Sequence, residues 1–178
     1  GEGNRQLNAP KLAGQEDWYL RRQLEYFKSG VRGTGPGDTF GMAMGPMANT
    51  LVDEAAVENV IAYIQTFPDD PTTKTVVGDI ENGEDIYNTC AVCHGQQGEG
   101  FAFMNAPRQA GLDDWYLVTQ LKNFRSGARG AHDDDAYGMQ MNMMAAILNT
   151  DEAINDVVAY INTLEGPAEK SNELAVME

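Results

Sequence analysis

Both cysteines of the chain lie in one short motif, Cys90-Ala91-Val92-Cys93-His94. Two thiols at this spacing can each form a thioether with a vinyl group of haem, and the histidine that follows can bind the iron. A redox dithiol needs no adjacent histidine, and a zinc site needs four ligands, whereas His132 is the only other cysteine or histidine. The motif therefore predicts covalent haem c at Cys90 and Cys93, with His94 as an iron ligand.

The chain of 178 residues is acidic, with 12 Lys and Arg against 27 Asp and Glu and a net charge of −15. Nucleic acid is not expected as a partner, because phosphate binding requires clustered basic residues. No run of about 18 apolar residues occurs, so no transmembrane segment is expected. The acidity favours redox partners with basic docking surfaces. The run Asp133-Asp134-Asp135 is either a solvated loop or a means of steering such a partner.

The chain contains a tandem repeat. Shifted by 97 positions, residues 1–68 align without a gap on residues 98–165, with 32 identities in 68 positions. The stretch from Asp69, with Pro71 and paired threonines, has the composition of a linker. We therefore divide the chain into a first repeat (1–68), a linker (69–80), a haem c domain (81–165, the second repeat) and a C-terminal tail (166–178).

Helical periodicity recurs in both repeats. The first apolar stripe ends before Gly30 and, in the copy, before Gly127, and both glycines suit helix C-termini. A second stripe recurs as Ala56, Val60, Tyr63, Ile64 and Ala153, Val157, Tyr160, Ile161, with Asp53 and Asp151 at the expected helix starts. The Gly- and Met-rich stretches between the stripes show no regular period. We predict an all-α fold with long functional loops.

Further residues around the motif resemble those of class I c-type cytochromes: Gly83, Ile86, Tyr87, Gly95, Gly98-Glu99-Gly100, Pro107, Gly111 and Tyr160. The resemblance covers residues 81–165 fully. In residues 1–68 the front end of the family's domain, with its N-terminal helix, is missing. With the duplication, the chain is most similar to dihaem cytochromes of the c-four type. The segment Tyr137–Met141 is also similar to cytochrome domains fused to haem–copper oxidase subunits.

The resemblance implies a methionine as the distal iron ligand. Counting back from Leu148, as the family's spacing suggests, gives Met141, and the same count from Leu51 gives Met44. Met144 is the alternative to Met141. A thioether suits an electron-transfer haem because it stays bound in both oxidation states and raises the potential. Most of the remaining methionines are expected to fill irregular gaps in the core.

The resemblance also implies roles around the ligands. The carbonyl of Pro107 would accept the Nδ1–H of the proximal histidine and fix its ring, and Pro10 has the equivalent position in the first repeat. Four side chains are candidates to reach the haem propionates: Trp115, Tyr116, Arg125 and Arg129. For the two aromatic residues, plain helix packing is an equally good interpretation.

The first repeat contains no cysteine or histidine, so by itself it cannot attach a haem. It nevertheless keeps Pro10 and Met44 at haem-domain positions. We therefore expect an upstream segment with a second C-x-x-C-H motif in the native protein, which would complete a second haem site. The alternative is a degenerate, haem-free first domain. Without its front helix, the first repeat would be poorly stable alone.

These features predict a periplasmic carrier of single electrons, not an enzyme, between a quinol-oxidising complex and a terminal oxidase or reductase. Association with a membrane respiratory complex, as a subunit or fused domain, is one alternative. A dihaem peroxidase is another, although a coordinated thioether would block its substrate. A third is copper(I) binding by the cluster Met42-x-Met44-x-x-Met47 and its copy.

Overall fold

A computed structural model describes residues 1–166, so the predicted tail lies outside the described residues except for Gly166. The first repeat contains α1 (Asp17–Ser29), α2 (Thr39–Ala48) and α3 (Glu54–Ile64). The second contains α4 (Ile80–His94), α5 (Asp114–Ser126), α6 (Ala136–Ala145) and α7 (Asp151–Ile161), and each repeat adds one 3-10 turn, η1 (Arg5–Leu7) or η2 (Ala102–Met104). Within residues 1–166 only isolated β-bridges occur beside these helices. The all-α prediction is confirmed.

The Gly- and Met-rich stretches are helices, so the prediction of irregular structure there was wrong. Both helices begin at a buried aspartate. Asp38 accepts a hydrogen bond from the Gly41 amide at 3.0 Å, and Asp135 accepts one from the Gly138 amide at 2.8 Å. These N-caps and the packing of α2 on α1 and of α6 on α5 offset the poor helix propensity of glycine. Asp135 is therefore a structural cap, whereas Asp133 and Asp134 are exposed.

The second repeat has a complete core in which α4 crosses α7. Gly83 permits the close crossing, because a Cβ there would lie 2.1 Å from the carbonyl oxygen of Asp156. Tyr87 is buried against Tyr160, with ring centroids 5.4 Å apart. The core cluster consists of Tyr87, Ala91, Leu112, Leu117, Leu148, Ile154, Val157, Val158 and Ile161.

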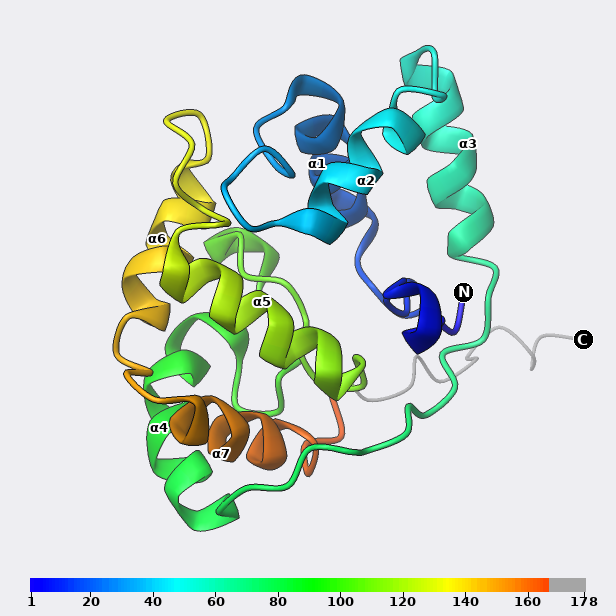
Figure 1. Cartoon of the computed structure of the whole chain (residues 1–178). Helices are drawn as coiled ribbons and strands as arrows, with labels where there is room; N and C mark the ends of the chain where they lie inside the picture. Colours follow the sequence, from blue (N-terminus) through cyan, green and yellow to red (C-terminus); the bar gives the residue numbers. More distant parts are fainter. Residues whose placement is uncertain (167–178) are drawn as a thin grey trace, which may run out of the picture.

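The first repeat has a smaller core, formed by Leu20, Val57, Ile61 and Ile64. Within the described residues nothing corresponds to α4, and Tyr63, the equivalent of Tyr160, is 63% exposed. The first repeat instead packs against the second, with α1 and α2 above α5 (Figure 1). The face of the first repeat that corresponds to the α4-covered face of the second stays exposed at Tyr63.

The linker runs from the end of α3 along the outside of the molecule to α4 (Figure 1). Its middle is fixed by Asp114, whose carboxylate accepts hydrogen bonds from the amides of Thr75 and Val76. Its first residue, Asp69, pairs with Lys11 of one repeat and Arg108 of the other. Among residues 1–166 no helix is long and apolar enough to cross a membrane.

Candidate functional site

The Cys-x-x-Cys-His motif occupies the last turn of α4, which places both thiols and the imidazole on one wall of a cavity. His94 is buried, and its Nδ1 lies 2.7 Å from the carbonyl oxygen of Pro107. Burial lowers the pKa of His94, although the Pro107 contact opposes the shift. A neutral ring that donates through Nδ1 leaves Nε2 with a lone pair for a metal.

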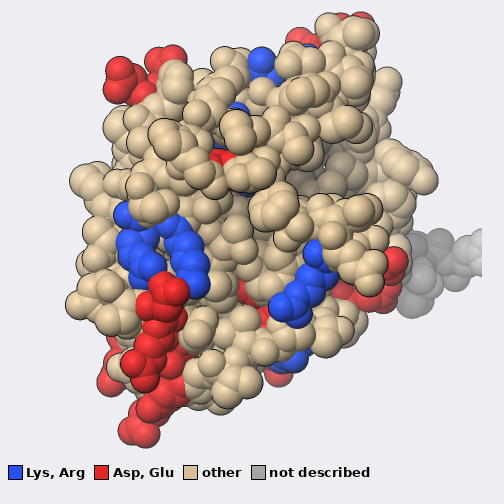
Figure 2. Space-filling view, viewed as in Figure 1, with Lys and Arg blue, Asp and Glu red and all other residues tan. Residues whose placement is uncertain are grey.

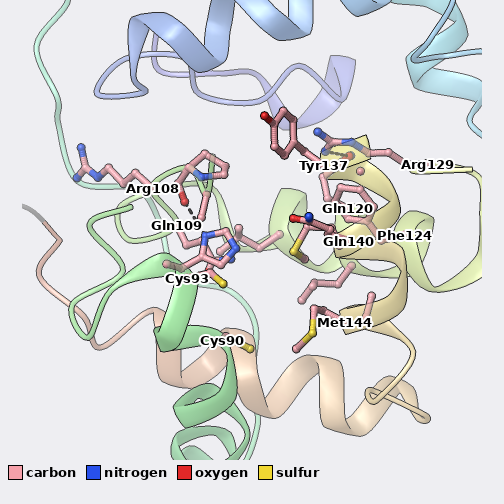
Figure 3. A pocket seen from close by; sticks show the side chains of 18 of the residues that line it. Cys90, Cys93, Arg108, Gln109, Gln120, Phe124, Arg129, Tyr137, Gln140 and Met144 are labelled. Atoms are coloured by element: carbon pink, nitrogen blue, oxygen red, sulfur yellow. Dashed lines mark hydrogen bonds between the residues drawn. The ribbon is translucent and has the colours of Figure 1, made fainter. Parts of the chain in front are cut away.

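The two thiols are free within the described residues and half-buried. Burial raises the pKa of Cys90 to about 11, so its thiol is protonated at neutral pH. The end of α4 is held in place by the following loop, because the Gly100 amide donates to the His94 carbonyl at 2.9 Å. Figure 3 shows both cysteine sulfurs on one side of the pocket and Met144 on the facing side.

The cavity and the solvent space at its open mouth together amount to about 1420 Å³. Most of its wall comes from the second repeat and is apolar, with Leu112, Leu117, Leu121, Phe124, Val157 and Ile161. The first repeat closes one side with Gln15, Tyr19, Arg22 and Gln23. An apolar cavity with a few polar groups at one edge is typical of a cofactor site.

Two of the four methionines of the second repeat's α6, Met141 and Met144, line the cavity. Met139 and Met143 do not, and Met143 is 65% exposed. Met141 is half-buried, whereas Met144 is 39% exposed. The leading candidate for the distal ligand and its alternative therefore both reach the site.

The remaining predicted residues divide into two groups. Pro107, Tyr116 and Arg129 line the cavity. Arg125 lies away from it and pairs with Asp151, and Trp115 is likewise outside the cavity wall. In the first repeat, Met44 lies on α2, 37% exposed, and Pro10 lies in the loop before α1.

Sequence reasoning missed a network of polar side chains between the repeats. Arg129 donates to the Tyr19 hydroxyl at 2.8 Å, and Arg32 donates to the Tyr116 hydroxyl at 3.1 Å. Both guanidinium groups also bond Gln23 and Gln120. The sequence does contain a sign of this network, because its tyrosine, glutamine and arginine each recur at the 97-residue spacing.

This network changes the chemistry of the tyrosine at the cavity edge. Burial by itself would raise the pKa of Tyr116, but the positive charges of Arg32 and Arg129 outweigh burial and lower it. Arg129 keeps its charge, because the polar oxygens around it hold its pKa above the ordinary value despite burial. The cavity edge is thus electropositive and suited to carboxylates.

Haem c fits this donor set. The motif offers two thiols for covalent attachment, a neutral imidazole for the iron and thioether sulfur across the cavity. The apolar wall suits the macrocycle, and the arginine-rich edge suits its propionates.

Comparisons with known proteins agree with this fit. Residues 1–68 and 80–165 match the family model for cytochrome c. Cytochrome c4 of Azotobacter vinelandii is 29% identical over 171 residues, which span 89% of this chain and 77% of that protein. The structure of Acidithiobacillus ferrooxidans cytochrome c4 superimposes with a TM-score of 0.68 at 28% identity, covering 87% of this chain and 88% of that one. A thiosulfate dehydrogenase electron acceptor of Stutzerimonas stutzeri is 38% identical over 78 residues, 44% of this chain and 32% of that protein.

Proposed function

Because this chain belongs to the cytochrome c family, as a class I cytochrome of the c-four type, we propose that it carries single electrons through a haem c ligated by His94 and Met141. The observation that carries the proposal is the cavity itself, in which two thiols and a neutral imidazole face methionine sulfur across an apolar space. When bound, haem c supplies an iron that changes between the ferrous and ferric states. Methionine ligation favours electron transfer over catalysis, because it leaves no open coordination position.

The chain's own residues would tether, orient and shield that group. Cys90 and Cys93 supply the covalent bonds. The Pro107 carbonyl orients His94 through its Nδ1–H, and such a bond also raises the basicity of the ligand. The apolar wall excludes water, and Arg129 and Tyr116 offer donors to the propionates.

A second haem in the first repeat is part of the proposal, on condition that an upstream segment with a C-x-x-C-H motif precedes Gly1. Its support is the preserved loop geometry. The amides of Leu12 and Ala13 donate to the Gly1 carbonyl, as those of Gln109 and Ala110 do to Gly98. Met44 and Pro10 would then have the roles of Met141 and Pro107.

We place the protein in the periplasm, between a quinol-oxidising complex and a terminal oxidase or reductase. The net charge of −15 suits partners with basic docking surfaces. Much of the face in Figure 2 is uncharged; acidic side chains lie at its lower left and along its upper edge, and basic side chains border the lower acidic group. One relative is named as a thiosulfate dehydrogenase electron acceptor, which favours a carrier that accepts electrons from a dehydrogenase. The second candidate function is that of a subunit in a dehydrogenase or oxidase complex.

Haem attachment is the direct test. The protein should be produced with haem c maturation, and its haem should stay with the polypeptide in acid acetone. Cys90→Ala combined with Cys93→Ala should release the haem, while Met139→Ala, outside the cavity wall, should retain it. A wild-type protein whose haem is extracted would overturn the proposal.

A further inference from the structure

The acidic residues at the starts of α1 and α5 do not cap their own helices. Their carboxylates instead accept hydrogen bonds from loop amides of the other repeat. Glu16 and Asp113 occupy the two N-cap positions, and neither side chain caps its own helix. The Glu16 carboxylate accepts a hydrogen bond from the Arg108 amide at 2.9 Å. The Asp113 carboxylate accepts one from the Lys11 amide at 2.7 Å.

The two contacts are reciprocal. Glu16 and Asp113 are equivalent under the 97-residue repeat, and so are Lys11 and Arg108. In each repeat the amide that donates belongs to the residue directly after a proline, Pro10 or Pro107. Each repeat therefore holds the proline loop of the other repeat. The Pro107 loop faces His94, and the Pro10 loop would face the proximal histidine of a second haem site.

Glycine makes room for both carboxylates. Gly100 has a φ of +80° and Gly3 a φ of +85°, in the left-handed region that favours glycine. A Cβ on Gly100 would lie 2.5 Å from the Glu16 carboxylate, and one on Gly3 would lie 2.9 Å from that of Asp113. The niche for each carboxylate thus depends on a glycine of the opposite repeat.

The side chain of Arg108 fastens the same loop a second time. Its guanidinium donates to the Gly14 carbonyl at 3.1 Å and pairs with Asp69. Lys11 makes the equivalent ion pair in the first repeat, because its ammonium lies 2.6 Å from the other carboxylate oxygen of Asp69. One linker carboxylate therefore joins both loops.

We propose that Glu16 of the first repeat is a positioning residue for His94 of the second. By holding the Arg108 amide, Glu16 fixes the adjacent Pro107 carbonyl at 2.7 Å from His94 Nδ1. Asp113 has the same role toward the Pro10 loop. The inference rests on the proposed haem function, because the His94–Pro107 bond sets the basicity of the iron ligand and so the reduction potential.

The experiment uses haem-loaded protein and three substitutions. Glu16→Ala removes charge and acceptor, whereas Glu16→Gln removes the charge and keeps an acceptor oxygen. Asp113→Ala is the matched control, because it removes a carboxylate that contacts the other loop. The readouts are hydrogen exchange of the Arg108 amide and the reduction potential of the haem at His94.

Glu16→Ala should speed exchange of the Arg108 amide about tenfold, the loss of about one hydrogen bond. It should also raise the potential by more than Glu16→Gln, because a weaker bond to Pro107 makes His94 a poorer ligand for ferric iron. Asp113→Ala should leave the Arg108 amide unchanged and speed exchange at Lys11.

Glu16→Asp serves if Glu16→Ala does not fold. It keeps the charge and withdraws the carboxylate by one methylene, so the Arg108 amide should exchange faster than in the wild type. Wild-type exchange in the Glu16 variants, or an equal change in Asp113→Ala, would overturn the positioning role. A wild-type haem spectrum without histidine ligation would instead overturn the proposed function, and amide exchange would still report the loop contact.

Discussion

Arg32 and Arg129 occupy the same position in the two repeats, and each donates a hydrogen bond to the tyrosine of the opposite repeat. Both are buried, and each guanidinium stacks on a phenylalanine ring of its own repeat, at 4.5 Å for Arg32 and 4.4 Å for Arg129. Only Arg129 lines the cavity of the second repeat. Substitutions of the two arginines therefore distinguish the effect of a charge beside the cavity from the effect of a charge that lies only between the repeats.

Arg129→Gln should lower the reduction potential of the haem at His94, since a nearby positive charge disfavours ferric iron. The expected shift is up to about 60 mV, a factor of ten for a one-electron couple. Arg32→Gln breaks equivalent bonds farther from the site and should shift this potential less. Protein-film voltammetry measures both, and equal shifts would contradict a propionate contact by Arg129.

Met141→Ala should abolish the charge-transfer absorption of a methionine–iron bond, because it removes the proposed distal sulfur. Met144→Ala should keep that band, although Met144 also lines the cavity. Optical spectra of the oxidised proteins decide between them. The opposite pattern would assign the distal ligand to Met144.

A chain extended upstream by a segment with a C-x-x-C-H motif should bind two haems, as counted by intact mass and pyridine haemochrome. Met44→Ala in that chain should alter the spectrum of one haem only. Burial of Tyr63, now 63% exposed, should accompany completion of the first repeat. Native protein with one haem and Gly1 as its true N-terminus would refute the second site.

Asp114→Asn should lower the free energy of unfolding by about 2 kcal/mol at pH 7, because the amide group of asparagine would face backbone donors. Burial by itself would raise the pKa of Asp114, but hydrogen bonds from Thr75, Val76 and Trp115 outweigh it and lower the pKa below 3.8. The contribution is thus present above pH 3.8 and is lost as the pH falls through the folded-state pKa.

Urea unfolding at several pH values checks this expectation. The difference between wild type and Asp114→Asn should shrink as the pH falls below 3.8, the ordinary aspartate value. The control is Asp17→Asn, the equivalent exposed position, whose carboxylate, within residues 1–166, bonds only the Trp18 amide. A difference that stays constant down to pH 2 would argue against the role of the Asp114 carboxylate.

The motif, the repeat and the glycine helix ends could be predicted because each depends on local spacing. Gly30 and Gly127 both have a φ of +79° at helix C-termini, and Asp53 caps α3. The Met-rich helices were missed, since their stability comes from buried caps and from packing on α1 and α5 rather than from periodicity. Asp135 looks like a loop charge in the sequence, because its role as the N-cap of α6 shows only in the folded structure.

The cross-repeat contacts were beyond the reach of pattern reading. Glu16 and Asp113 look like ordinary acidic residues at helix starts, a position that favours them on local grounds alone. Only the docked arrangement shows that their carboxylates leave their own helices for the amides of Arg108 and Lys11. Their recurrence in both repeats was visible, but a repeat does not reveal which copy a side chain faces.

The exchange of carboxylates between the repeats also limits how this chain can evolve. After a gene duplication, two copies ordinarily drift apart, each tolerating substitutions that the other never meets. Here Gly100 must leave space for Glu16, and Gly3 must leave space for Asp113, so a mutation in either copy is tested against the other. Loss or exchange of either half would leave the loop of the other half without its carboxylate partner.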